Sequence, residues 1–266
     1  MTEPILSLRA ATKRFGGLVA VDAMDFDVRP GKVMGLIGPL VAVDAMDFDV
    51  RPGQVMGLIG PNGSGKSTTL NLISGAARPT SGQITLRGAS IGGMRADVIA
   101  RKGIARTFQL VRLLPSLTTI ENVIAGAAFG HRRRWGEAAH RDAARLLERV
   151  GLGGKGATGV GQLTYIDTKR VELARALASD PEVLLLDEWL AGLNPTELQV
   201  GIELIQSLRD EGRTIVLVEH VMDAIRSLCD TCVVMASGAK IAEGATDEVL
   251  AHPEVIRAYL GDDDDA

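Results

Sequence analysis

The residues with the clearest capacity for chemistry lie in one glycine-rich run, residues 60–69. The run fits the pattern G-x-x-x-x-G-K-[ST], whose glycines let backbone N–H groups turn toward a bound phosphate. Lys66 would reach the β- and γ-phosphates of a nucleotide, and the hydroxyl of Ser67 would bind Mg²⁺. We therefore predict a nucleotide site formed by Gly60, Pro61, Asn62, Gly63, Ser64, Gly65, Lys66, Ser67 and Thr68.

The segments on either side of this run have the composition that such a site needs. Residues 55–59 are a short apolar run that predicts a buried strand, and residues 68–74 predict a helix that stops at Gly75. The N-terminus of that helix would add positive potential next to the phosphates. A chance glycine-rich turn is the alternative interpretation, and the flanking strand and helix argue against it.

Polar side chains occur at the ends of three other predicted strands: Gln109 on the first, Asp187 and Glu188 on the second, and His220 on the third. Ligands of parallel α/β sheets bind beyond these strand ends. Asp187 would hold Mg²⁺ through its water shell, Glu188 would polarise the attacking water, and Gln109 would sense or ligate the metal. His220 would hydrogen-bond the γ-phosphate. Taken singly, each residue is also common in caps and loops, but the set predicts phosphoryl transfer to water.

The composition limits the possible classes of protein. The chain has 266 residues, 46% of them hydrophobic, which is enough for one large α/β domain or a large lobe plus a small one. The net charge of −4 shows no basic excess, so we expect no nucleic-acid partner. The first four residues lack a signal-peptide layout, and no apolar run approaches the roughly 18 residues that cross a bilayer. We expect a cytosolic or peripheral protein.

One segment of the sequence occurs twice in tandem. Residues 18–39 and 40–61 are identical except for Lys32 in the first copy and Gln54 in the second. A single tandem copy is too short for a solenoid, which needs at least three repeats. The surplus residues could loop out anywhere along the repeat at nearly the same closure cost. We predict that the second copy supplies the strand before the glycine-rich run, because the two are covalently joined.

Two smaller features have both a chemical and a structural interpretation. Cys229 and Cys232 form a lone C-x-x-C without a second Cys or His pair at zinc spacing, so we favour core packing over a redox or metal site. Residues 131–135 form a basic cluster with one tryptophan. This cluster could touch lipid headgroups or a partner, but we favour a solvated loop or helix face.

The remaining patterns predict alternating strands and helices. The predicted strands cover residues 5–10, 83–87, 104–109, 183–186, 214–218, 232–236 and 240–243. The predicted helices cover residues 95–102, 167–178, 196–209, 222–228 and 246–260. The segment from residue 110 to about residue 160 is mostly helix-forming, with a cap at residues 118–121 and an amphipathic stretch at residues 141–150. The acidic residues 262–265 predict a disordered tail.

The order of the motifs resembles the nucleotide-binding subunits of ATP-binding-cassette (ABC) transporters over nearly the whole chain. The motifs are the glycine-rich run, Thr107-Phe108-Gln109, residues 184–188, residues 191–195 and residues 218–220. Three stretches are more closely similar to the ATPase subunits of branched-chain amino-acid importers. They are residues 105–109, residues 187–188 with 191–197, and residues 241–244 with 252–261.

This resemblance implies an α/β fold of the P-loop NTPase type: a RecA-like lobe, an antiparallel β-subdomain and a helical subdomain. Residues 1–266 would form one ABC ATPase domain. The RecA-like core and β-subdomain would cover residues 1–109 and 166–250. The helical subdomain would cover residues 110–165, and a C-terminal helix with the acidic tail would cover residues 251–266.

The resemblance also implies the function. Two subunits would clamp two ATP molecules with Mg²⁺ and drive separate integral-membrane permease subunits, and an extracytoplasmic solute-binding protein would act indirectly. The chain would be cytoplasmic and peripheral on the inner face of the membrane. Phe15 would match the residue that stacks on adenine, and Asn194 would belong to the loop that crosses the dimer seam.

Three features depart from the family pattern. One is the tandem repeat, which inserts 22 residues between Phe15 and the glycine-rich run, so Phe15 would stack on adenine only if the surplus loops out after the first copy's strand. The signature that contacts the partner's ATP is usually Leu-Ser-Gly-Gly-Gln, and here it is Leu163, Thr164, Tyr165, Ile166 and Asp167. Ile166 places a β-branched side chain where close approach to a phosphate favours glycine. The proline that usually follows the catalytic glutamate is Trp189. Two alternatives therefore stay open: a partner-dependent regulatory subunit with impaired hydrolysis, and a cassette ATPase without a transporter.

Overall fold

The computed structural model describes residues 4–15, 18–28, 33–34, 56–229, 231–236 and 239–260. The chain divides into two compact units. The first unit comprises Met1–Met94 and Leu190–Ala266, and the second comprises Arg95–Trp189. The subdomain boundaries expected from the sequence stay a prediction.

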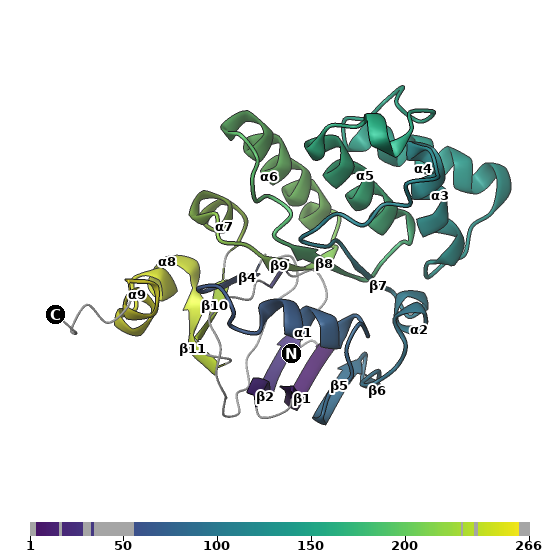
Figure 1. Ribbon diagram of the computed structural model, residues 1–266. Helices are drawn as coiled ribbons and strands as arrows, with labels where there is room; N and C mark the ends of the chain where they lie inside the picture. The colour runs from purple at the N-terminus through teal and green to yellow at the C-terminus, as the bar shows by residue number, and fades with distance from the viewer. Residues whose placement is uncertain are drawn as a thin grey trace. The chain divides into compact units, whose positions relative to one another are not determined.

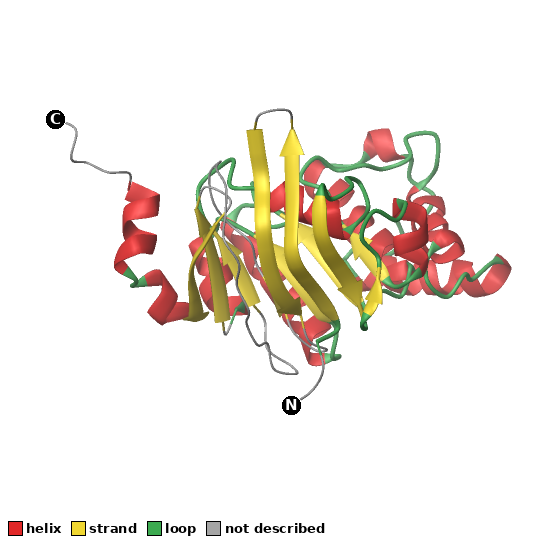
Figure 2. Cartoon of the chain, turned by 90° about the horizontal axis from the view of Figure 1, so that it is seen from below, coloured by secondary structure: helices red, strands yellow, loops and turns green. Residues whose placement is uncertain are grey.

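The first unit contains a four-stranded antiparallel sheet, which is visible as strands in Figure 2. Its strands are β1 (Leu6–Phe15), β2 (Leu18–Val28), β5 (Ser81–Leu86) and β6 (Ala89–Ser90), in the order β2-β1-β5-β6. Leu8 of β1 lies opposite Phe26 on one side and Ile84 on the other, and Leu8 and Ile84 are buried. The predicted strand at residues 5–10 therefore extends to Phe15, because it pairs along its length with the first copy of the repeat.

The second sheet segment of this unit carries the glycine-rich loop. The strand β4 (Met56–Ile59) lies between two parallel neighbours, β9 (Thr214–Val218) and β10 (Thr231–Ala236). The strand β11 (Ala239–Ala245) pairs antiparallel with β10. All five residues of β9 are buried, as expected for a strand covered on both faces. The second copy of the repeat thus supplies the strand before the loop, which confirms the prediction.

The first copy of the repeat contributes a further short strand, β3 (Val33–Met34), which also pairs in parallel with β9. Met34 lies opposite Val216, and so does Met56 at the start of β4. Equivalent methionines of the two copies therefore share one partner position on β9. The predicted loop-out of the surplus residues and the acidic tail fall on residues 35–55 and 261–266, which lie outside the described residues.

The helices of the first unit include α1 (Lys66–Ile73), α6 (Pro195–Asp210), α7 (Met222–Leu228), α8 (Thr246–Leu250) and α9 (Pro253–Leu260). The prediction of one helix over residues 246–260 is wrong, because the helix breaks before Pro253. A proline disfavours helical geometry in the preceding residue, here His252, and it suits the first position of a new helix. The ribbon turns between α8 and α9 in Figure 1.

The second unit combines a parallel strand pair with a helical layer. Its strands are β7 (Ile104–Arg106) and the fully buried β8 (Val183–Asp187), and its helices are α2 (Ala96–Arg101), α3 (Thr119–Phe129), α4 (Gly136–Arg149) and α5 (Tyr165–Ala178). The helices α3, α4 and α5 pack on one another (Figure 1). Gly126 permits the close approach of α3 to α5, since a Cβ there would lie 2.1 Å from the carbonyl oxygen of Arg175.

The predicted cap at residues 118–121 is confirmed. Thr118 accepts a hydrogen bond from the backbone N–H of Glu121, and the Glu121 carboxylate accepts one from Thr118 in return. Within residues 110–160, predicted to be mostly helix-forming, the α-helices cover Thr119–Phe129 and Gly136–Arg149, and residues 110–118 before the cap are not helical. The Asn122 side chain stabilises the non-helical conformation of this segment through hydrogen bonds with the backbone N–H and carbonyl oxygen of Leu114.

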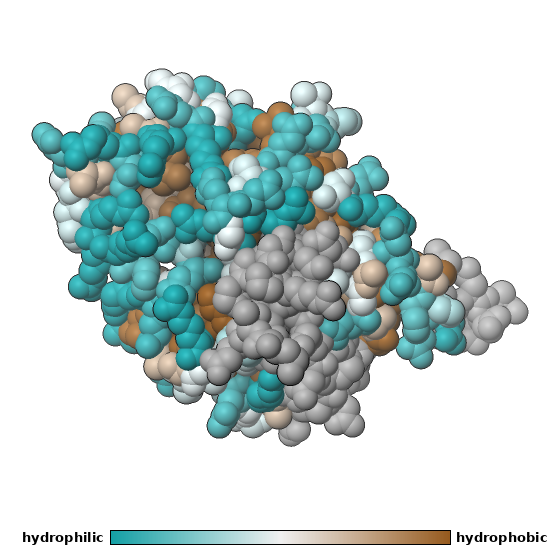
Figure 3. Space-filling model, turned by 180° about the vertical axis from the view of Figure 1, so that it is seen from behind, coloured by the Kyte–Doolittle hydropathy of each residue, from teal (hydrophilic) through white to brown (hydrophobic). Residues whose placement is uncertain are grey.

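No helix within the described ranges is long and apolar enough to cross a membrane. On the face shown in Figure 3, hydrophilic residues cover most of the described surface, and the apolar ones form small scattered patches.

Candidate functional site

The glycine-rich loop joins β4 directly to α1 in the first unit. Gly63 and Gly65 have φ angles of 88° and 94°, in the left-handed region that glycine adopts without a steric penalty. Gly65 is the N-cap of α1 and supplies no side chain to cap it. No N-cap side chain therefore competes with an anionic ligand for the first N–H groups of this helix, and the helix dipole adds positive potential there.

Lys66 and Ser64 bring polar groups into the same loop. The Lys66 side chain is buried, and its ammonium donates hydrogen bonds to the carbonyl oxygens of Gly60 (3.5 Å) and Pro61 (3.1 Å). The Ser64 hydroxyl is buried and has no hydrogen-bond partner among the residues that the structure describes. Ser67 and Thr68 follow in half-buried positions. A buried cation and an unsatisfied hydroxyl in one loop fit a phosphate-bearing ligand, whose oxygen atoms would accept a hydrogen bond from that hydroxyl.

A second group of predicted site residues lies in the second unit, at the end of β8. Asp187 forms an ion pair with Arg106 (Oδ2 to Nη2, 2.7 Å) in which the side chains are 3% and 6% exposed. The amide of Gln109 donates a hydrogen bond to the Glu188 carboxylate (2.8 Å). The structure thus brings Gln109 and Glu188 together, while Asp187 faces Arg106. An amide donor and a carboxylate acceptor side by side can orient a water molecule or hold a cation.

The backbone at Glu188 is held by helix α5. Glu188 has a φ angle of 48°, which is uncommon for a residue other than glycine. The Lys169 ammonium donates hydrogen bonds to the carbonyl oxygens of Glu188 (3.2 Å) and Trp189 (3.0 Å). The indole N–H of Trp189 donates in turn to the carbonyl oxygen of Lys169 (3.0 Å). Trp189, the departure from the family proline, is therefore an integral part of this contact.

Glu172 holds the chain on both sides of Gln109. Its buried carboxylate accepts hydrogen bonds from the backbone N–H groups of Phe108 (3.1 Å) and Arg112 (2.8 Å). Burial raises the pKa of Glu172, although the two N–H donors and nearby Arg175 act in the opposite direction. The guanidinium groups of Arg106 and Arg112 lie over the Phe108 ring, at 5.0 Å and 4.5 Å from its centroid.

The sequence did not single out Arg106, Lys169 or Glu172. One signal for the latter two was present, because Lys169 and Glu172 fall at helical spacing with Leu173 and Ala176 on the buried face of α5. A charged residue in such an apolar stripe needs a specific partner. The distant carbonyl and N–H groups that serve as partners could not be found from spacing.

The signature segment, residues 163–167, forms the N-terminus of α5. The Thr164 hydroxyl caps the helix by accepting the N–H of Asp167 (3.2 Å), and the Asp167 carboxylate is buried in an ion pair with Lys155 (2.7 Å). Tyr165 is exposed, while Leu163 and Ile166 are half-buried. The segment therefore presents a hydroxyl and a tyrosine where the family pattern has serine and glycine.

The other predicted site residues lie in the first unit. His220 is exposed and follows the buried Glu219, whose carboxylate accepts the N–H of Leu190 (2.6 Å). Asn194 caps α6 in a reciprocal arrangement with Glu197. Phe15 ends β1 opposite Leu18, and its side chain lies outside the described part of the chain.

Cys229 and Cys232 are both buried and form no disulfide with each other, and the prediction that they pack in the core is confirmed. A Cβ on Gly57 of β4 would lie 2.6 Å and 2.9 Å from their sulfur atoms, so the pair fills the space beside that glycine. Within the described residues there is no group of three or more metal-ligating side chains that could hold a metal ion.

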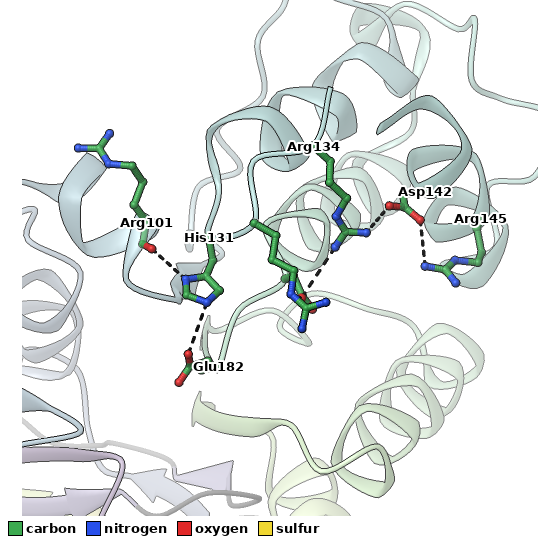
Figure 4. Close-up of polar contacts among 8 residues, drawn as sticks. Arg101, His131, Arg134, Asp142, Arg145 and Glu182 are labelled. Atoms are coloured by element: carbon green, nitrogen blue, oxygen red, sulfur yellow. Dashed lines mark hydrogen bonds and ion pairs between the residues drawn. The ribbon is translucent and has the colours of Figure 1, made fainter. Parts of the chain in front are cut away.

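The basic cluster at residues 131–135 makes internal contacts in the second unit (Figure 4). His131 Nδ1 lies 2.9 Å from the carbonyl oxygen of Arg101, and its Nε2 lies 3.6 Å from the carboxylate of Glu182. Arg134 pairs with Asp142. These contacts engage much of the basic charge within the unit, which supports the structural interpretation over lipid contact.

A buried strand, a loop with left-handed glycines and a helix that begins at a buried lysine define a P-loop nucleotide-binding protein. The family model described as "ABC transporter" matches residues 43–191. A second model, described as "Branched-chain amino acid ATP-binding cassette transporter", matches residues 239–265. The chain belongs to the ABC transporter ATP-binding family, and both the predicted family and the predicted fold class are confirmed.

Curated relatives cover nearly the whole chain. The high-affinity branched-chain amino acid transport ATP-binding protein LivG of Escherichia coli (strain K12) is 37% identical over 98% of this chain and 100% of its own length. The corresponding protein BraF of Pseudomonas aeruginosa is also 37% identical, with the same coverage.

Solved structures show the same fold. An ATP-binding cassette of an ABC transporter in its ADP conformation has a TM-score of 0.80 and 28% identity, covering 98% of this chain and 100% of that one. A bacterial ABC transporter cassette solved as a dimer has a TM-score of 0.76 and 25% identity, covering 91% of this chain and 98% of that one.

Proposed function

We propose that the chain is the ATP-binding and ATP-hydrolysing subunit of an importer for branched-chain or other amino acids. The observation that carries this proposal is the glycine-rich loop, with a buried Lys66, an unsatisfied Ser64 hydroxyl and an uncapped α1. The ATPase class is that of the family. The choice of amino acids as the imported solute follows the names of the full-length relatives LivG and BraF.

The glycine-rich loop would bind the nucleotide. Its backbone N–H groups and the ammonium of Lys66 would hold the β- and γ-phosphates, and Phe15 would stack on adenine. Mg²⁺ bound with ATP would neutralise charge on the phosphate oxygens, and Ser67, Asp187 and Gln109 would hold it.

Glu188 would accept a hydrogen bond from the attacking water and polarise it toward the γ-phosphate. The amide of Gln109, 2.8 Å from that carboxylate, would keep it oriented. His220 would donate a hydrogen bond to the γ-phosphate, where negative charge has to be stabilised during transfer. These roles divide the work into positioning and electrostatic stabilisation, as phosphoryl transfer requires.

The partners follow from the family. We propose that two ATPase subunits form a dimer and that their closure on ATP drives integral-membrane permease subunits. An extracytoplasmic solute-binding protein would act indirectly. The chain would lie on the cytoplasmic face of the membrane. Thr164 at the N-cap of α5 and Asn194 at the N-cap of α6 would face the second subunit and its ATP.

A second candidate function is a subunit that binds ATP but hydrolyses it only beside a partner with an intact signature. Tyr165 and Ile166 favour it, because their side chains stand where glycines would allow a phosphate close to the backbone. The ion pair with Lys155 also engages the Asp167 carboxylate, so that carboxylate would not contact the partner's nucleotide.

The test combines two substitutions with measurements of Mg-ATP binding and hydrolysis. Lys66→Ala should lower the affinity for Mg-ATP at least about tenfold, because a charge-assisted contact to phosphate is lost. Glu188→Gln should keep the affinity but lower turnover about 100-fold or more and trap an ATP-bound dimer in size-exclusion chromatography. Unchanged turnover in Glu188→Gln would contradict the assigned role. Turnover that appears only after mixing with an intact-signature subunit would establish the second candidate.

A further inference from the structure

Lys169 and Trp189 bond to each other and to the peptide of Glu188 within the second unit. The Lys169 ammonium reaches the carbonyl oxygens of Glu188 and Trp189 at 3.2 Å and 3.0 Å, and the Trp189 indole N–H reaches the carbonyl oxygen of Lys169 at 3.0 Å. The residues are only 2% and 3% exposed. A buried ammonium is tolerated only where acceptors compensate for lost hydration, so these contacts are specific requirements of the fold.

The contact acts on a backbone conformation that side-chain-bearing residues rarely adopt. Glu188 has a positive φ of 48°, and the surroundings must hold a residue that lies there. Hydrogen bonds from a charged donor are stronger than neutral ones, and Lys169 makes two of them at this turn. The direction in which the Glu188 side chain leaves the backbone therefore depends on Lys169.

The position of Lys169 on α5 gives it a second neighbour. It lies one helical turn after Tyr165 of the signature segment, and its ammonium is 5.2 Å from the centroid of the Tyr165 ring. Lys169 is thus in contact with the segment expected to face the partner's ATP and with the peptide of the glutamate expected to act on this chain's own ATP.

We propose that Lys169 and Trp189 are positioning residues that set the orientation of the Glu188 carboxylate, and that they transmit displacement of the signature turn to Glu188. The proposal rests on the proposed function of Glu188 in ATP hydrolysis. Trp189 takes the place of the family's usual proline, and its indole N–H supplies a donor that proline lacks. Neither residue touches the reacting atoms.

The test uses substitutions that keep side-chain size but remove a donor. Lys169→Met and Trp189→Phe should each lower kcat for ATP hydrolysis about 10- to 100-fold, because a small misplacement of a reacting group costs this much. The KM for ATP should change less than about twofold, since the glycine-rich loop is untouched. Lys169→Arg keeps a cationic donor and should recover much of the loss. Matched controls are Lys102→Met and Trp135→Phe, the latter in an exposed tryptophan of the same unit.

A fluorescence measurement adds a signature that loss of packing alone would not produce. The chain has two tryptophans, so Trp189 is the sole one in a Trp135→Phe background. Adding Mg-ATP together with the second ATPase subunit should shift the emission of Trp189, because displacement of the signature segment would change the surroundings of the indole. Adding Lys169→Met to this background should abolish that shift.

The outcomes separate this proposal from the proposed function. Turnover retained in Glu188→Gln would overturn the function of Glu188, whatever the other variants do. Turnover lost in Glu188→Gln but unchanged in a folded Lys169→Met would overturn only the positioning proposal. Should Lys169→Met fail to fold, Trp189→Phe decides: an unchanged kcat in this variant would overturn the proposal.

Discussion

Arg106 forms a buried ion pair with Asp187, the carboxylate that we propose would hold Mg²⁺. The two side chains are nearly inaccessible to solvent and lie 2.7 Å apart. A buried ion pair does little for net stability when compared with apolar residues, but loss of one partner leaves a charge that water cannot reach. The pair therefore makes the conformation of this strand end sensitive to a single side chain.

Arg106→Met should lower the free energy of unfolding by about 3–5 kcal/mol, because Asp187 stays buried without this counter-charge. Urea denaturation of the full chain measures the change. The matched control is Arg141→Met, which breaks the solvent-exposed pair of Arg141 with Glu137 and should change stability little. An equal and small effect of both substitutions would contradict the importance of the buried pair.

At the residue scale, the sequence predicted the polar groups at strand ends but not their environment. Gln109 and Glu188 were predicted to act together, and they lie within hydrogen-bond distance. Arg106, Lys169 and Glu172 were missed, since their partners are 81, 19 to 20, and 60 to 64 residues away in sequence. Motifs record spacing along the chain, and these contacts depend on how β7, β8 and α5 pack.

At the element scale, the packing of strand β4 depends on the absence of a side chain at Gly57. Gly57 faces the sulfur atoms of Cys229 and Cys232, and any Cβ would come closer to them than real contacts allow. The strand that leads into the glycine-rich loop can thus approach the end of α7 and the start of β10 this closely only because residue 57 is a glycine. The C-x-x-C spacing serves packing against this strand.

Gly57→Ala should lower the free energy of unfolding by about 1–3 kcal/mol through overpacking, and it should weaken Mg-ATP binding because the loop follows the displaced strand. Adding Cys229→Ala removes the nearest sulfur and should restore part of the loss. Gly159→Ala is the control, since a Cβ there meets no atom within 4 Å. Equal effects of Gly57→Ala and Gly159→Ala would show that the space beside β4 is not limiting.

Elements with strong periodicity were predicted closely, and those governed by a single residue or a long-range pairing were not. The strand at residues 214–218 and the helix at residues 222–228 have the predicted bounds. The break before Pro253 was missed, because one proline outweighs local propensity.

At the scale of the whole molecule, the tandem repeat is used twice. The first copy provides β2 and β3, and the second provides β4. Residues 29–55 link Val28 to Met56. In a chain with a single copy, the link between the same two positions would be about one fifth as long. A shorter link lowers the cost of closing the loop by about 1–2 kcal/mol, while the pairing of β3 with β9 is lost.

Deletion of residues 18–39 should therefore leave the free energy of unfolding equal or about 1 kcal/mol higher, with unchanged Mg-ATP affinity and hydrolysis. Denaturation, nucleotide binding and phosphate release measure the three quantities. Deletion of residues 40–61 is the matched control, because the two products differ only in whether lysine or glutamine precedes the strand. Loss of ATP binding in both products would show that both copies are needed for a functional site.

The shared position opposite Val216 has a consequence for how the first unit reaches its native state. Either copy offers β9 the same valine and methionine, so early pairing has no side-chain preference between them. Only the copy joined to residues 62–69 can close the phosphate loop, whereas the described pairing of the other copy with β9 comprises Val33 and Met34. We therefore expect the two copies to compete for the same register on β9 during folding, and chain connectivity rather than side-chain chemistry to decide the outcome.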